Sequence, residues 1–224
     1  MMSRLMFIVG LTGVGKSTTF KALQAAGLDF ELLPNRRDLT DKVIIPQMQK
    51  ALGWAAGEVR DRVMRFELTK AYRERHPKGM AKVVKDYLDE AKPSHPLLVF
   101  DNLRGENEVG AALELFAKSY FIMLDAPEEV RLRRILGRQD SFDQVSSQLL
   151  KDSENLPEVE GISPEELKKA LSIIQSEKEN YDAVATAKVL KERCAEGQLL
   201  YLDTSLLSID EVSRQIQMWL REIT

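Results

Sequence analysis

The residues with the clearest chemical meaning lie between Gly10 and Ser17, where the chain reads Gly-Leu-Thr-Gly-Val-Gly-Lys-Ser. Glycines in such a loop let the backbone bend so that consecutive N–H groups point at phosphate oxygens. A helix beginning near Lys16 adds the positive end of its dipole to the same anion. The lysine ammonium suits the β- and γ-phosphates, and the serine hydroxyl suits a magnesium ion. The segment therefore predicts a phosphate-binding P-loop.

The surroundings of this loop separate it from a glycine-rich turn that matches the pattern by chance. An apolar run from Leu5 to Val9 leads into it, and a helical pattern with Phe20 and Leu23 follows. A P-loop requires this order of strand, loop and helix. We therefore expect these residues to bind a nucleoside triphosphate: Gly10, Thr12, Gly13, Val14, Gly15, Lys16, Ser17 and Thr18.

A second candidate is Asp101, which ends the apolar run from Leu97 to Phe100. In P-loop proteins, a strand beside the loop places such an aspartate at the magnesium ion or its water shell. Hydrophobic residues followed by aspartate are common, so the presence of the P-loop is what favours this role. We predict that Ser17 and Asp101 hold magnesium, and that Lys16 and Asp101 are catalytic.

Three arginines follow the run from Tyr120 to Leu124. On a helix, Arg131, Arg134 and Arg138 would share one face. Phosphoryl transfer needs cations because negative charge spreads over the oxygens of the moving phosphate. We therefore predict that Arg134 and Arg138 are catalytic. The alternative is a solvated basic stripe that is countered by the neighbouring carboxylates, Glu128 and Glu129.

Further arginines could hold the phosphate or acidic part of an acceptor, because guanidinium groups bind such anions bidentately. The candidates follow the second and third apolar runs or share a helical face, and they are Arg36, Arg37, Arg62, Arg65 and Arg104. The alternative is that they are surface residues paired with nearby carboxylates, namely Glu106 or Glu108 for Arg104 and Asp38, Glu58 and Asp61 for the others.

Five short apolar runs alternate with helical patterns along the chain. They are residues 5–9, 30–33, 97–100, 120–124 and 199–202. This alternation predicts an α/β fold in which helices cover both faces of a five-stranded parallel sheet, a three-layer sandwich. Asp125, followed by Pro127, is expected to cap the next helix, and Ser208 with Glu211 predicts a capping box at the start of the last one.

Two intervals are too long for a plain crossover between strands, and we interpret them as helical insertions in a single domain of residues 1–224. Residues 41–96 are predicted to hold about two helices, one of which turns Val59, Val63 and Phe66 inward, and to form the acceptor side. Residues 127–196 are predicted to form a lid and helical insertion, with a helix that begins at Ser163-Pro164.

The composition limits the possible partners and metals. The 224 residues are 44% hydrophobic and 30% charged with a net charge of -3, which gives no overall attraction to nucleic acid. A single cysteine, Cys194, excludes an internal disulfide and a multi-cysteine zinc site, and the two histidines, His76 and His95, each lie beside a proline and do not suggest a metal pair. Magnesium is therefore the only metal that we expect. The first apolar run is too short for a secretion signal or a membrane span, so we expect a cytoplasmic protein.

Taken together, these motifs resemble the nucleoside-monophosphate-kinase-like branch of the P-loop kinases, such as adenylate kinases and dephospho-coenzyme A kinases. The resemblance implies the sheet order 2-3-1-4-5, ATP and magnesium at Lys16 and Ser17, an acceptor at Arg104 and a lid that carries Arg134 and Arg138. The residues that carry it are Gly10 to Ser17, Asp101 to Arg104 with Glu108, Asp125 to Arg138, and Leu199 to Ser205.

The resemblance implies a small-molecule kinase that moves the γ-phosphate of ATP to a nucleotide or another phosphorylated small molecule. A different class remains open, because the long insertions would also suit an ATPase or nucleotide-responsive regulator with a protein partner. A nucleic-acid end kinase that uses the basic groups is a third and weaker hypothesis.

Overall fold

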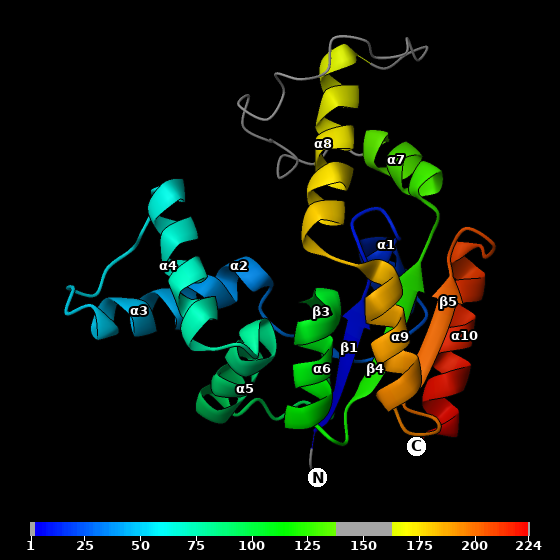
Figure 1. Cartoon of the computed structure of the whole chain (residues 1–224). Coiled ribbons are helices and arrows are strands. Elements are labelled where there is room, and N and C mark those ends of the chain that lie inside the picture. Colours follow the sequence, from blue (N-terminus) through cyan, green and yellow to red (C-terminus); the bar gives the residue numbers. More distant parts are fainter. Residues whose placement is uncertain (1–2, 138–162, 224) are drawn as a thin grey trace. The chain divides into compact units, whose positions relative to one another are not determined.

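The computed structural model describes residues 3–137 and 163–223 (Figure 1). Two compact units make up the chain, and we describe each by itself. The first unit comprises Met1–Val9, Leu28–Met123 and Val184–Leu200. The second unit comprises Gly10–Gly27, Leu124–Ala183 and Tyr201–Thr224. Neither unit is one continuous stretch of sequence, because the chain crosses between them repeatedly.

Five strands form one sheet in the order β2-β3-β1-β4-β5, which confirms the predicted order. The ladders that join β1 to β3, β1 to β4 and β2 to β3 are all parallel. The strands are β1 (Arg4–Val9), β2 (Glu31–Leu32), β3 (Leu97–Leu103), β4 (Tyr120–Asp125) and β5 (Leu199–Asp203).

The central strand β1 is buried because it has neighbours on both edges and apolar side chains on both faces. Met6, Phe7 and Ile8 have no exposed surface. The Phe7 ring stacks on Phe121, with centroids 5.3 Å apart, and meets Phe100 edge-on at 6.3 Å. A run that is apolar at every position is typical of a strand buried in a parallel sheet. This strand fixes the starting point of the loop at Gly10.

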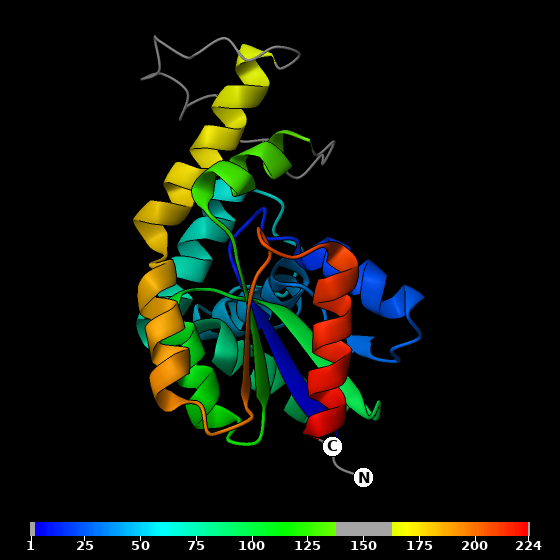
Figure 2. The same ribbon diagram turned by 90° about the vertical axis from the view of Figure 1, so that its right-hand side faces the viewer.

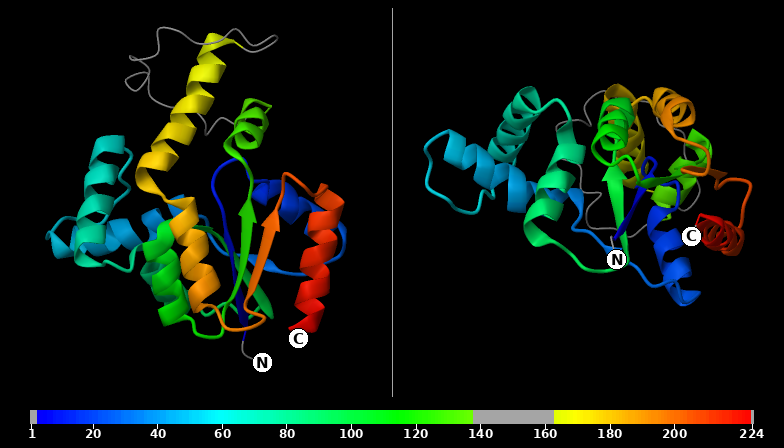
Figure 3. Two further views of the ribbon diagram at one scale, coloured as in Figure 1. Left: turned by 45° about the vertical axis from the view of Figure 1, so that its right-hand side comes forward. Right: turned by 90° about the horizontal axis from the view of Figure 1, so that it is seen from below.

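The helices of the first unit all contribute buried residues to the core that includes β1 and β3. They are α2 (Arg36–Leu39), the π-helix η1 (Thr40–Ile44), α3 (Ile45–Ala51), α4 (Arg62–Arg75), α5 (Gly79–Ala91), α6 (Gly105–Leu115) and α9 (Ala183–Arg193). Figure 3 shows α6 and α9 lying side by side. An ion pair of 3.4 Å between Glu114 of α6 and Arg193 of α9 joins them.

The prediction of about two helices in residues 41–96 was too low, because α3 and most of the π-helix η1 precede α4 and α5 there. Val59 was also misplaced. It is buried as predicted but lies in the loop before α4, because the Asp61 carboxylate caps this helix by accepting from the Met64 N–H at 2.7 Å. The side chains of Val63 and Phe66 lie outside the described residues.

The helices of the second unit form two packed pairs. Helix α1 (Lys16–Ala25) contacts α10 (Ile209–Glu222), and α7 (Glu128–Leu136) contacts α8 (Pro164–Asn180). Figure 2 shows the second pair, which packs Ile135 against Ala170 and Ile174. The capping box predicted at Ser208 with Glu211 is confirmed, and the helix expected to begin at Ser163-Pro164 does so, with a second capping box between Ser163 and Glu166.

The expected helix cap at Asp125 was wrong. The residue before α7 is Pro127, which has no side-chain cap, and Asp125 accepts hydrogen bonds from the Ala126 N–H at 2.9 Å and the Tyr201 hydroxyl at 2.6 Å. The hydrogen bond to this carboxylate, together with burial, raises the pKa of Tyr201 to about 12. Asp125 therefore connects the ends of β4 and β5.

A search of the described helices for a membrane span finds none with the necessary length and apolar character.

We predict that Ser208→Ala lowers the melting temperature by roughly 2 to 4 °C, because the helix loses its N-cap. Hydrogen bonds from Ser208 hold the pKa of Glu211 below its ordinary value of 4.5. The difference between the two proteins should therefore be full at neutral pH and shrink as the pH falls below 4.5. Calorimetry at several pH values measures this difference.

Ser176→Ala is the matched control, because Ser176 is an exposed residue in the interior of helix α8. Its melting temperature should change by less than that of Ser208→Ala. Equal melting curves for the two variants at neutral pH would contradict the stabilising role of the capping box.

Candidate nucleotide-binding site

The predicted P-loop leaves β1 at Gly10 and enters α1 at Lys16. Gly13 and Gly15 have positive φ angles of 87° and 99°, which residues with a side chain rarely adopt. A Cβ atom on Gly13 would also lie only 2.8 Å from the carbonyl oxygen of Arg131. The glycine at this position therefore lets helix α7 approach the loop closely.

The carbonyl groups of the loop accept hydrogen bonds from cationic side chains. The Lys16 Nζ donates to the carbonyls of Gly10 at 2.6 Å and Leu11 at 3.1 Å. The Arg131 Nε donates to the carbonyl of Thr12 at 2.8 Å. Lys16 therefore folds back along its own loop, and Arg131 of α7 holds the next carbonyl.

The next two carbonyls of the loop have partners as well. The Arg134 Nη1 donates to the carbonyl of Gly13 at 3.3 Å, and the Thr204 hydroxyl donates to that of Val14 at 2.9 Å. Arg134 also donates to the Thr204 hydroxyl at 2.8 Å and to its carbonyl at 2.7 Å. In a trans peptide the N–H points away from the C=O, so the amides of Gly13, Val14 and Gly15 point away from these partners.

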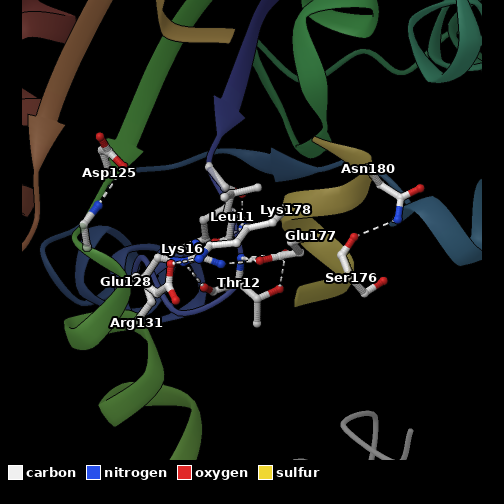
Figure 4. Close-up of polar contacts among 12 residues, drawn as sticks. Leu11, Thr12, Lys16, Asp125, Glu128, Arg131, Ser176, Glu177, Lys178 and Asn180 are labelled. Carbon is white, nitrogen blue, oxygen red and sulfur yellow. Dashed lines mark hydrogen bonds and ion pairs between the residues drawn. The ribbon is translucent and has the colours of Figure 1, made fainter. Parts of the chain in front are cut away.

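Thr12 binds a carboxylate that the sequence analysis did not identify. Its N–H and its hydroxyl donate to Glu177 Oε1 at 2.9 and 2.7 Å (Figure 4). Arg131 forms an ion pair with Glu177, and each of these two side chains is only 6% exposed. Glu177 lies on the same stripe of α8 as the buried residues Leu167, Ala170 and Ile174. A carboxylate on the apolar face of a helix was the signal that could have found it.

A pocket of about 280 Å³ lies beside the loop in the second unit. Its lining combines apolar side chains with threonines and one arginine: Gly13, Val14, Gly15, Thr18, Thr19, Arg134, Thr204, Leu207, Ile209 and Val212. Thr19 is 1% exposed, and its hydroxyl has no hydrogen-bond partner among the described residues. A buried polar group of this kind next to a pocket is a candidate for binding a polar ligand.

The two residues predicted to hold magnesium belong to different units. Ser17 is exposed in the first turn of α1. Asp101 is half-buried and does not end its strand as predicted, because β3 continues to Leu103. A hydroxyl and a carboxylate are the oxygen donors that magnesium prefers, so the residue types fit the ion. Within the described residues, no three His, Cys, Asp or Glu side chains gather as a metal site.

Two of the three arginines predicted to share a face, Arg131 and Arg134, are not part of a solvated stripe. Arg131 is buried, and Arg134 is bound to the loop and to Thr204. Glu128, one of the two carboxylates suggested as their partners, pairs with Lys178 at 2.5 Å. Arg138 lies outside the described residues. The catalytic roles of Arg134 and Arg138 stay predictions.

In the first unit, Glu108 gathers part of the predicted acceptor site. Its carboxylate accepts both Arg36 Nη1 and Arg36 Nη2, at 2.8 and 2.7 Å. It also accepts the N–H of Arg104 at 2.9 Å and of Met80 at 3.3 Å. Glu108 is 8% exposed, so this buried carboxylate joins the starts of α2, α5 and α6. Arg36 therefore pairs with Glu108, a carboxylate that the sequence analysis suggested as a partner of Arg104.

The remaining acceptor candidates are less closely grouped. Arg37 is exposed in α2. Arg65 forms an ion pair with Asp41 and donates to the carbonyl of Val59 at 3.0 Å, so its partners differ from those suggested by the sequence. Arg62 begins α4, and its side chain lies outside the described residues. The acceptor roles of these residues stay predictions.

The sheet order and the glycine-rich loop between β1 and α1 define the fold of the P-loop NTPases. A family model described as an AAA domain matches residues 6–154, which is more than half of the chain. The chain belongs to this family. The resemblance to P-loop proteins is thus confirmed for fold and family.

The solved structures that this chain resembles have low sequence identity to it. TT1252 from Thermus thermophilus has a TM-score of 0.53 and 16% identity, with all of both chains covered. A sugar kinase from Janibacter sp. has a TM-score of 0.49 and 17% identity, covering 98% of this chain and 95% of the other. Deoxyadenosine kinase from M. mycoides has a TM-score of 0.49 and 14% identity, covering 97% and 99%. Among curated proteins, none matches the sequence.

We predict that Glu108→Ala destabilises the protein by about 3 kcal/mol, because it leaves the Arg36 guanidinium and two N–H groups without their acceptor. Glu106→Ala is the control, because Glu106 is an exposed residue in the same turn of α6. Its free energy of unfolding should change by no more than about 0.5 kcal/mol. Urea denaturation measures both values, and equal stabilities would contradict the role assigned to Glu108.

Proposed function

We propose that this protein is an ATP-dependent phosphotransferase that moves the γ-phosphate of ATP to a nucleotide or another phosphorylated small molecule. The observation that carries the proposal is the P-loop, in which the carbonyls of residues 10 to 14 all have side-chain donors. Because these carbonyls already accept hydrogen bonds, they do not face the anion site, and the backbone N–H groups of the loop can bind an anion there.

We infer that the pocket beside the loop receives the base of the nucleotide. It is concave, mostly apolar and lined by a few polar groups, as sites for flat ligands are. The buried Thr19 hydroxyl could exchange a hydrogen bond with a ring nitrogen or an exocyclic group of the base.

In this proposal, Ser17 and Asp101 hold the magnesium ion that accompanies ATP. The bound ion would neutralise charge on the β- and γ-phosphates. Lys16 would bind the same phosphates without leaving its carbonyl partners, because an ammonium group has three N–H donors.

Arginines supply the remaining positive charge in the proposal. We infer that Arg134 and Arg138 face the phosphate in transfer, and that Arg36, Arg37 and Arg104 bind the anionic end of the acceptor together with Arg62 and Arg65. An acceptor oxygen forms a bond to the γ-phosphorus while the bond from that phosphorus to the β,γ-bridging oxygen breaks, which leaves ADP. Positioning and charge neutralisation account for such a reaction without a covalent protein intermediate.

We predict that Lys16→Ala abolishes ADP formation, with a loss of at least about a hundredfold, because the transferred phosphate loses a cation that offsets its charge. The assay contains ATP, magnesium and a panel of nucleoside monophosphates and dephospho-coenzyme A. Lys21→Ala is the control, because Lys21 is an exposed residue of the same helix. Both variants should melt cooperatively like the wild type.

The panel also separates the proposed function from its alternative. ADP that forms only when an acceptor is present supports the kinase. ADP that forms at the same rate without any acceptor supports the ATPase or regulatory protein instead. No ADP above background with any acceptor would contradict the proposed function.

A further inference from the structure

We propose that Glu177 of α8 and Arg131 of α7 act as positioning residues for the nucleotide site, by holding Thr12 so that the P-loop keeps its phosphate-binding shape before ATP arrives. This inference rests on the proposed function and extends it to Glu177, a residue 165 positions beyond Thr12 in the sequence. Helix α8 would then take part in nucleotide binding through Glu177.

Two side chains from different helices bind the polar groups of Thr12. Figure 4 shows Glu177 and Arg131 converging on it from two helices. Glu177 accepts the Thr12 N–H and hydroxyl, and Arg131 donates to the Thr12 carbonyl. All three polar groups of Thr12 are therefore bound by an ion pair. A residue held in this way cannot rotate without breaking charge-assisted hydrogen bonds.

The location of the pair argues for a role in the loop. An ion pair at the surface also joins α7 to α8, between Glu128 and Lys178, whose side chains are 46% and 54% exposed. Arg131 and Glu177 join the same helices, but each of their side chains is only 6% exposed. Removing these two charges from water costs free energy. The buried pair differs from the surface pair because it also binds Thr12. We infer that these contacts with Thr12 are the reason for burying the pair.

The consequence for binding is preorganisation. A loop that is mobile before binding must lose conformational entropy when it closes around phosphate, and this loss weakens affinity. Holding Thr12 in place also orients the peptide unit that follows it, whose N–H belongs to Gly13. Because Arg131 balances the carboxylate of Glu177, the pair achieves this without placing a net negative charge beside the anion site.

The experiment compares magnesium-ATP binding by calorimetry and thermal melting in the full chain. We expect Glu177→Gln to weaken ATP binding by about tenfold, because the loop loses its anchor. Lys178→Ala is the matched control at the exposed pair, and its affinity should equal that of the wild type. Thr12→Val keeps the ion pair but removes one donor, so it should weaken ATP binding severalfold with little change in melting temperature.

A double variant separates positioning from stability. Replacing both charges by apolar residues, in Arg131→Met with Glu177→Leu, should restore the melting temperature toward that of the wild type, because buried ion pairs can be replaced at little cost. If the pair positions the loop, ATP affinity stays low in this variant. If stability and affinity both return to the wild-type values, the pair is only structural and the inference is overturned.

Two further outcomes are distinguishable. If the wild type binds ATP and Glu177→Gln binds it equally well or more tightly, the positioning role is wrong while the proposed function stands. If the wild type itself binds no magnesium-ATP, the proposed function fails and this inference fails with it. Thr12→Val provides the decisive comparison should Glu177→Gln not fold.

Discussion

A loop of backbone amides can bind phosphate only if the carbonyl oxygens of the same loop have other partners, because a carbonyl that faced the anion would repel it. In this protein, Lys16, Arg131, Arg134 and Thr204 provide those partners for residues 10 to 14. Three of these four residues come from parts of the chain far beyond the loop. The P-loop is therefore shaped by tertiary contacts of the second unit as well as by its own glycines.

The same constraint explains why charged groups are buried beside the loop. Arg131 and Glu177 would be an expensive way to join two helices, since apolar side chains do so at lower cost. Ile135, Ala170 and Ile174 already provide an apolar contact between α7 and α8. The ion pair supplies a donor for the carbonyl of Thr12 and an acceptor for its N–H and hydroxyl, which apolar side chains cannot supply. In the first unit, Glu108 similarly gathers Arg36 and the N–H of Arg104.

Much of the fold could be predicted because its signals are local. Apolar runs located all five strands, and the serine-glutamate spacings located the starts of α8 and α10. The partners of the arginines could not be predicted, because they depend on contacts between residues 46 or 72 positions apart, as in Arg131 with Glu177 and Arg36 with Glu108. Glu177 could have been noticed as a carboxylate on the apolar stripe of α8. The stripe alone, however, does not show which residue this carboxylate binds.

We propose that the loop amides beyond Thr12 bind the phosphates, while the N–H of Thr12 stays with Glu177. Amide NMR of isotope-labelled protein during a titration with magnesium-ATP tests this claim most directly. We expect large shifts for the amide signals of residues 13 to 18 and a small shift for Thr12. Unchanged signals for residues 13 to 18 at saturating ATP, or the largest shift at Thr12, would contradict it.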